Sequence, residues 1–76
     1  MKEILESMLK PLVDNKEAIS INQVEKDKIT VFEVRVAPED MGRVIGKQGR
    51  IAQAIRTLVK AAAIKANKRV NVEIIE

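Results

Sequence analysis

The three glycines of this chain lie within eight consecutive residues, at Gly42, Gly46 and Gly49. Glycine permits a positive φ and lets the backbone come close to a ligand. Lys47 and Gln48 separate the last two glycines, so the sequence predicts a tight turn at this point. An apolar helical pattern begins directly after Gly49. The turn therefore lies at a helix N-terminus, where free N–H groups and a partial positive charge suit a phosphate.

The formal net charge of +3 is unevenly distributed along the chain. Residues 1–40 carry six basic and nine acidic side chains, whereas residues 41–72 carry eight basic side chains and no acidic one. A long segment with one sign of charge is typical of a surface that faces a polyanion. The alternative is a solvated basic face without a partner. The eight basic residues are Arg43, Lys47, Arg50, Arg56, Lys60, Lys65, Lys68 and Arg69.

The hydrophobic periodicity predicts six elements in the order helix, strand, strand, helix, helix, strand. Such an order favours an α+β fold in which a three-stranded sheet carries three helices on one face. We expect Leu58 and Ala66 in the buried stripe of the long helix, and Ile64 as an exposed apolar contact. The expected ranges are a helix over 2–10, strands over 18–25 and 29–37, a short helix from Pro38 to Gly46, a long helix over 50–66 and a strand over 70–74.

The run from Ala37 to Asp40, followed by Gly42 through Thr57, resembles the KH domains of small bacterial single-KH proteins of the KhpA type. The resemblance covers nearly the whole chain and implies one type II KH domain over residues 1–76. It also implies that Gly46, Lys47, Gln48 and Gly49 clamp about four nucleotides of single-stranded RNA. Further implications are a broad-specificity RNA regulator or chaperone, linked to cell division, cell shape or the ribosome, and self-association or pairing with a larger protein of the KhpB type.

Other site residues follow from charge and position. Arg43 and Arg50 flank the turn, and we expect Lys68 and Arg69 to close the far side of a groove. Arg56 is either a solvated helix position or a phosphate contact. We expect Ile45 and Ala52 to form an apolar floor for the bases, although KH domains usually have a bulky aliphatic residue where Ala52 stands. Ile45 also fits a core position. The lone aromatic residue, Phe32, fits the core, which predicts weak and loosely selective binding.

The composition excludes several other functions. The chain has no His and no Cys, its basic half offers no carboxylate as a general base, and the phosphate loop of nucleotide hydrolases is absent. We therefore expect no enzyme, metal, cofactor or small-molecule substrate. No apolar run approaches the roughly 20 residues that a membrane helix needs, so we expect a cytoplasmic protein. Two alternatives stay open: an ordinary helix-turn-helix connection at the glycines, and a protein-interaction module with a KH fold that binds no nucleic acid.

Overall fold

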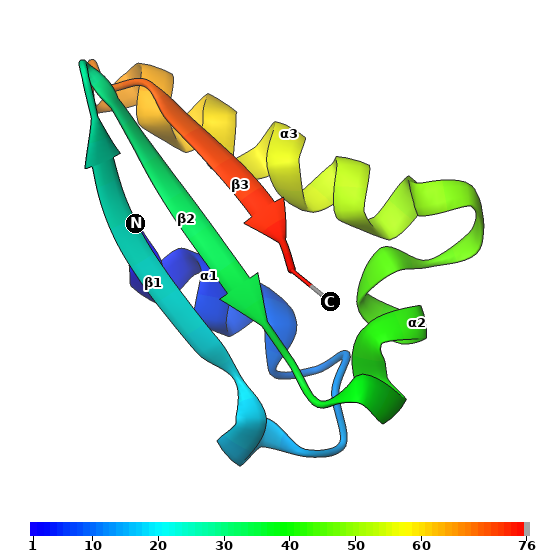
Figure 1. Ribbon diagram of the computed structural model, residues 1–76. Coiled ribbons are helices and arrows are strands. Elements are labelled where there is room, and N and C mark those ends of the chain that lie inside the picture. Colours follow the sequence, from blue (N-terminus) through cyan, green and yellow to red (C-terminus); the bar gives the residue numbers. More distant parts are fainter. Residues whose placement is uncertain (76) are drawn as a thin grey trace.

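The computed structural model describes residues 1–75. Its elements follow the predicted order of helix, strand, strand, helix, helix, strand, so the predicted α+β architecture is confirmed (Figure 1). Short 3₁₀ turns cover Lys16–Ala18, Pro38–Asp40 and Lys47–Gly49. The helices and strands are α1 (Lys2–Leu9), β1 (Ser20–Lys26), β2 (Ile29–Arg35), α2 (Met41–Ile45), α3 (Arg50–Lys65) and β3 (Val70–Ile74).

The three strands form one mixed sheet in the order β1-β2-β3. Strands β1 and β2 are antiparallel, and Lys26 pairs with Ile29 across a two-residue turn in which Asp27 has a φ of 53°. Strands β2 and β3 are parallel, with Thr30 opposite Val70. Parallel neighbours need a long crossover connection, and α2, the glycine turn and α3 together supply it.

The core lies between the sheet and the helices. Helices α1 and α3 cover one face of the sheet, whereas α2 packs against α3 beyond the end of the strands (Figure 1). Alternation along β2 and β3 turns apolar side chains towards the helices, which is the pattern of a sheet with one covered face. The innermost side chains are Leu5, Leu9, Phe32, Val34, Val44 and Val59.

The buried stripe of α3 differs from the predicted one. Leu58 is 58% exposed and Ala66 is also exposed, so both predictions were wrong. Ile64 is 76% exposed, as expected. The residues of α3 that are buried are Ala52, Ile55, Val59 and Ala63.

The remaining differences concern the ends of elements. Strand β1 begins at Ser20 rather than residue 18, because Lys16–Ala18 form a 3₁₀ turn. Helix α1 ends at Leu9, and Pro11 lies in the turn that follows, where its missing N–H removes no helical hydrogen bond. Strand β2 ends at Arg35, two residues earlier than predicted.

Candidate nucleic-acid interface

The glycine turn adopts positive φ angles, which glycine residues allow. Gly46 ends α2 with φ 74° and ψ −179°, and its N–H donates to the carbonyl of Gly42 at 2.9 Å. Gln48 and Gly49 also have positive φ, of 57° and 75°. A Cβ built at Gly46 would lie 2.6 Å from Cγ1 of Ile51, so the turn folds tightly over the first residues of α3.

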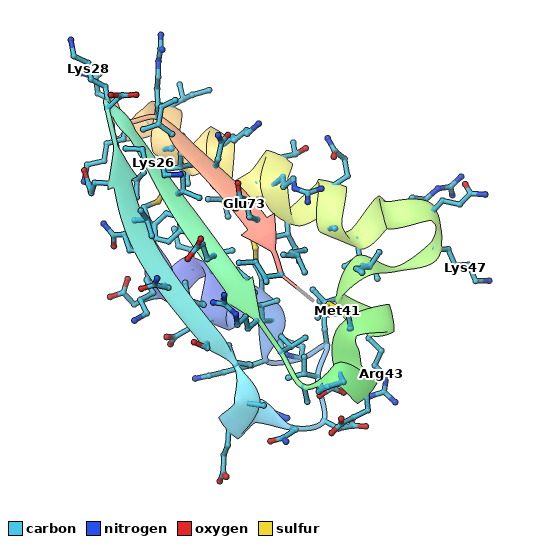
Figure 2. All side chains as sticks on the ribbon, viewed as in Figure 1. Lys26, Lys28, Met41, Arg43, Lys47 and Glu73 are labelled. Atoms are coloured by element: carbon cyan, nitrogen blue, oxygen red, sulfur yellow. The ribbon has the colours of Figure 1, made fainter. Side chains whose placement is uncertain are left out.

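The turn leaves hydrogen-bond donors exposed. The N–H of Gly49 donates to the carbonyl of Gly46 at 3.3 Å, whereas the N–H groups of Lys47 and Gln48 have no backbone acceptor among the described residues. Both of these side chains are exposed, and Lys47 points away from the helices into solvent (Figure 2). The arrangement combines free N–H groups, a mobile ammonium group and the N-terminus of a 16-residue helix, which together suit an anion.

The two arginines beside the turn have different surroundings. Arg50 is exposed and forms no ion pair with any residue in the described part of the chain. Arg43 binds the carboxylate of Asp14 through Nη1 at 2.9 Å, and both side chains are largely exposed. An exposed pair of this kind adds little stability, so an incoming phosphate can compete for the guanidinium.

Asp40 anchors the segment that leads into α2. Its side chain is 1% exposed, and its two carboxylate oxygens accept the backbone N–H groups of Asp14 at 3.1 Å and Asn15 at 3.0 Å. These two hydrogen bonds, with a smaller contribution from Arg43, hold the pKa of Asp40 below its usual value. The partners of Asp40 lie 25 and 26 residues away, so no local signal could identify them.

The apolar side chains beside the turn are not those that the sequence indicated. Ala52 is 4% exposed and lies in the core, so it cannot form a floor for a base. Ile45 is half-buried next to the turn, as is Ile51, whose side chain lies under Gly46. The accessible aliphatic surface at this place therefore comes from Ile45 and Ile51.

Arg56 has a structural contact that the sequence did not reveal. Its Nε donates to the backbone carbonyl of Val72 at 3.2 Å, which fastens α3 to the edge of β3. The side chain is half-buried. Arg56 is therefore neither simply a solvated helix position nor simply a phosphate contact, the two roles that the sequence left open. A phosphate could reach only the part of the guanidinium that this hydrogen bond leaves free.

Lys68 and Arg69 lie far from the glycine turn. They follow α3, whose 16 residues span about 24 Å at the usual helical rise, so the structure does not bring them together with Lys47. They line a cavity of about 260 Å³ between the C-terminal half of α3 and β3, with Lys60 on its rim. The seam between α3 and β3 thus has separate basic groups at its two ends.

Metal-ion sites and membrane-spanning helices are both absent from residues 1–75. No group of three or more acidic, His or Cys side chains in this range is placed to hold a metal ion. None of the helices there combines the length and the apolar character that crossing a membrane requires.

Comparisons with known proteins match the chain to a family of KH-domain proteins. The family described as KhpA/KhpB, KH domain, matches residues 2–74. A protein of Caldanaerobacter subterraneus named RNA-binding protein KhpA is 60% identical over 75 residues, covering 99% of this chain and all of the relative. A protein of the same name from Aquifex aeolicus is 49% identical over 76 residues, covering 100% of this chain and 96% of the relative.

A solved structure shows the same fold. The crystal structure of Aquifex aeolicus Era Y63A bound to GDP·AlF4⁻ superposes with a TM-score of 0.65 at 19% identity. The superposition covers 95% of this chain but only 28% of the Era chain, so it concerns the fold alone. The matching family is defined by a KH domain and is not a family of enzymes, so the expectation that the chain is not an enzyme is confirmed. With a family match over residues 2–74 and relatives of about its own length, the chain belongs to the KhpA/KhpB family of KH-domain proteins.

Proposed function

We propose that this chain is an RNA-binding protein that holds about four nucleotides of a single strand at the turn formed by Gly46, Lys47, Gln48 and Gly49. The observation that carries the proposal is the turn itself, which presents two free N–H groups and an exposed lysine at the start of α3. The printed name of the relatives, RNA-binding protein KhpA, supports RNA as the ligand.

The turn would act mainly on the sugar-phosphate chain. The N–H groups of Lys47 and Gln48 face one phosphate, and the ammonium group of Lys47 adds a charge that can follow it. Arg50 and Arg43 lie on either side of the turn and would contact the neighbouring phosphates. If about four phosphates are neutralised, log affinity should fall against log salt with a slope of about −3 on a single strand.

Base selectivity should be low. Stacking on an aromatic side chain contributes about 1–3 kcal/mol per base in other single-strand binders. The only aromatic residue, Phe32, is 2% exposed, so its ring cannot stack on a base. The aliphatic surface of Ile45 and Ile51 remains as a contact for the bases. These properties suit a cytoplasmic RNA regulator or chaperone of broad specificity.

A second KH subunit would compensate for weak binding at one site, because two linked sites raise avidity without new contacts. Helix α3 exposes Ile64 and Leu58, which are 76% and 58% accessible. We propose Ile64 as the centre of this surface, with either a second copy of the chain or a larger KH-containing protein of the KhpB type as the partner. The family description, which joins KhpA and KhpB, supports the second alternative.

A filter-binding assay with mixed RNA tests the clamp. The variant Lys47→Asp plus Gln48→Asp changes two exposed side chains and should lose binding while its circular dichroism spectrum stays that of the wild type. The control Lys10→Asp plus Ser7→Asp makes the same change in net charge on exposed positions of α1 and its C-terminal end, outside the turn. It should bind almost as the wild type does.

The opposite result would support the alternative function. If the clamp variant and the wild type bind RNA equally, the turn does not hold the strand. A KH fold that serves protein interaction would then explain the exposed apolar side chains of α3 better. A salt titration adds an independent criterion, because a flat response would show that no phosphates are neutralised.

A further inference from the structure

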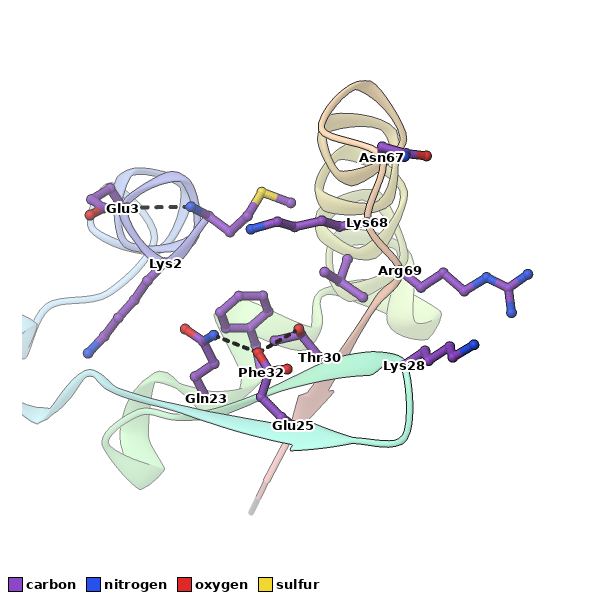
Figure 3. Close-up of a pocket in the computed structure, with 12 residues that line it drawn as sticks. Lys2, Glu3, Gln23, Glu25, Lys28, Thr30, Phe32, Asn67, Lys68 and Arg69 are labelled. Carbon is purple, nitrogen blue, oxygen red and sulfur yellow. Dashed lines mark hydrogen bonds and ion pairs between the residues drawn. The ribbon is translucent and has the colours of Figure 1, made fainter.

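A cavity of about 740 Å³ lies at the end of the molecule opposite the glycine turn. It opens between the N-terminus of α1, the tip of the β1–β2 hairpin and the loop from α3 to β3 (Figure 3). Lys28 at the hairpin tip and Lys47 in the turn mark the two ends of the molecule (Figure 2). The volume is within the range of about 300–1,000 Å³ that ligand sites usually have.

The cavity adjoins the smaller cavity between α3 and β3. Lys68, Arg69 and Val70 line it, and the same three residues line the smaller cavity between α3 and β3. The loop before β3 is thus a shared wall between the two cavities. A strand that follows α3 from the turn would reach this loop and then the larger cavity.

The rim of the cavity is basic. Lys2, Lys28, Lys68 and Arg69 line it, and none of them forms an ion pair within the described part of the chain. The side chain of Lys68 extends across towards α1, whereas Lys28 and Arg69 extend in the opposite direction, away from α1 (Figure 3). Glu3 also lines the rim, where it accepts a hydrogen bond from the amino terminus at 3.5 Å.

The wall of the cavity carries one carboxylate that can accept further hydrogen bonds, that of the exposed residue Glu25. Oε1 of Glu25 accepts hydrogen bonds from Nε2 of Gln23 at 3.3 Å and from the hydroxyl of Thr30 at 3.2 Å. These exposed bonds orient the carboxylate on the cavity wall, and its Oε2 has no partner among residues 1–75. Phe32 and Val70 close the bottom of the cavity, where both are almost fully buried. A fixed carboxylate oxygen accepts from an exocyclic amino group, such as N4 of cytosine, which uracil lacks.

We propose that this cavity binds one further nucleotide of the RNA strand beyond the four at the glycine turn, and that it prefers cytosine to uracil. The proposal rests on the proposed function, since it extends the path of the same strand. Lys28 and Lys68 contact the phosphates at the rim, and Glu25 accepts from the base amino group. The binding footprint of one chain is therefore longer than a single clamp.

Fluorescence anisotropy with labelled oligonucleotides tests this path. A short oligonucleotide of about four nucleotides measures the clamp alone, and oligonucleotides of about ten nucleotides, with the same core and a tail of cytidines or uridines, add the cavity. The wild type should bind the cytidine tail about fivefold more tightly than the uridine tail. Lys28→Ala should reduce the gain from either tail, and Glu25→Ala should remove the difference between them.

Matched controls separate this inference from the proposed function. Lys28→Ala should leave the affinity for the short oligonucleotide unchanged. Lys10→Ala removes the same charge at the C-terminal end of α1, whereas the cavity lies at its N-terminal end. It should change the affinity for neither the short nor the long oligonucleotides. Failure of the short oligonucleotide to bind would refute the clamp. Normal binding of the short oligonucleotide with no gain from the tails would overturn the cavity proposal alone.

Discussion

Replacing each of the three glycines by alanine should give three different results. At Gly42 the new Cβ meets no heavy atom within 4 Å, and the residue lies in α2. An alanine there should raise the free energy of unfolding by about 0.5 kcal/mol, because glycine is the poorer helix former. At Gly49 the space is also open, but φ is 75°. The left-handed backbone costs an alanine about 1–2 kcal/mol.

Gly46→Ala should be the most damaging of the three. Its φ of 74° and ψ of −179° lie in a region that only glycine adopts easily, and an alanine there costs about 1–3 kcal/mol. The Cβ would also lie 2.6 to 2.9 Å from three atoms of Ile51, and such overpacking costs about 1–3 kcal/mol more. A loss of about 2–6 kcal/mol is large, since a 76-residue domain has about 4–11 kcal/mol in total.

Urea unfolding followed by far-ultraviolet circular dichroism measures these values, because the chain contains no Trp or Tyr for fluorescence. The order of stability should be Gly42→Ala, wild type, Gly49→Ala, Gly46→Ala. The double variant Gly46→Ala plus Ile51→Ala should lose less stability than the two single variants together, by about 0.5–3 kcal/mol, since the crowded atoms are gone. Equal stability of Gly46→Ala and Gly49→Ala would refute the packing of the turn over Ile51.

Two further predictions follow from the anchor of α2 and from the exposed face of α3. Because the hydrogen bonds from Asp14 and Asn15 lower the pKa of Asp40, its contribution to stability is present above the usual pKa of about 3.9 and is lost as the pH falls through the lower folded value. Thermal melts followed by circular dichroism should therefore show that the melting temperature of the wild type falls further than that of Asp40→Asn between about pH 5 and pH 2. Parallel curves of melting temperature against pH would contradict this account. Ile64→Glu should leave the melting temperature almost unchanged, since Ile64 is 76% exposed, and should shift sedimentation towards the monomer. A wild type that sediments as a monomer at high concentration would refute the homodimer.

The order of elements and the turn could be predicted because both are written in local patterns. Alternating side chains such as Phe32 and Val34 identify a strand whatever its neighbours are. Gly46 and Gly49 indicate positive φ by themselves, and both have it. These are effects of the backbone and of nearest neighbours, which a single sequence contains.

The remaining features depend on contacts between distant segments. The rotation of α3 was misjudged because alanines and larger apolar residues occur around much of the helix, so its apolar pattern did not distinguish Leu58 from Ala63. The hydrogen bonds of Asp40 and Arg56 join residues that are 16 to 26 positions apart. The separation of Lys68 from the glycine turn follows from the length and straightness of α3, which charge counting along the sequence does not consider.

The hydrogen bond from Arg56 also affects how this protein behaves at high concentration. Strand β3 is an outer strand of the sheet, and the backbone groups along such an edge are a template for strands of other molecules. Arg69 and Ile75 direct their backbone groups to β2. In a parallel ladder every second residue does so, and the residues between them face the other way. The carbonyl of Val72 therefore points to the open side of the sheet. The guanidinium of Arg56 already donates a hydrogen bond to that carbonyl. A strand from another molecule would have to displace it, which protects this edge against aggregation.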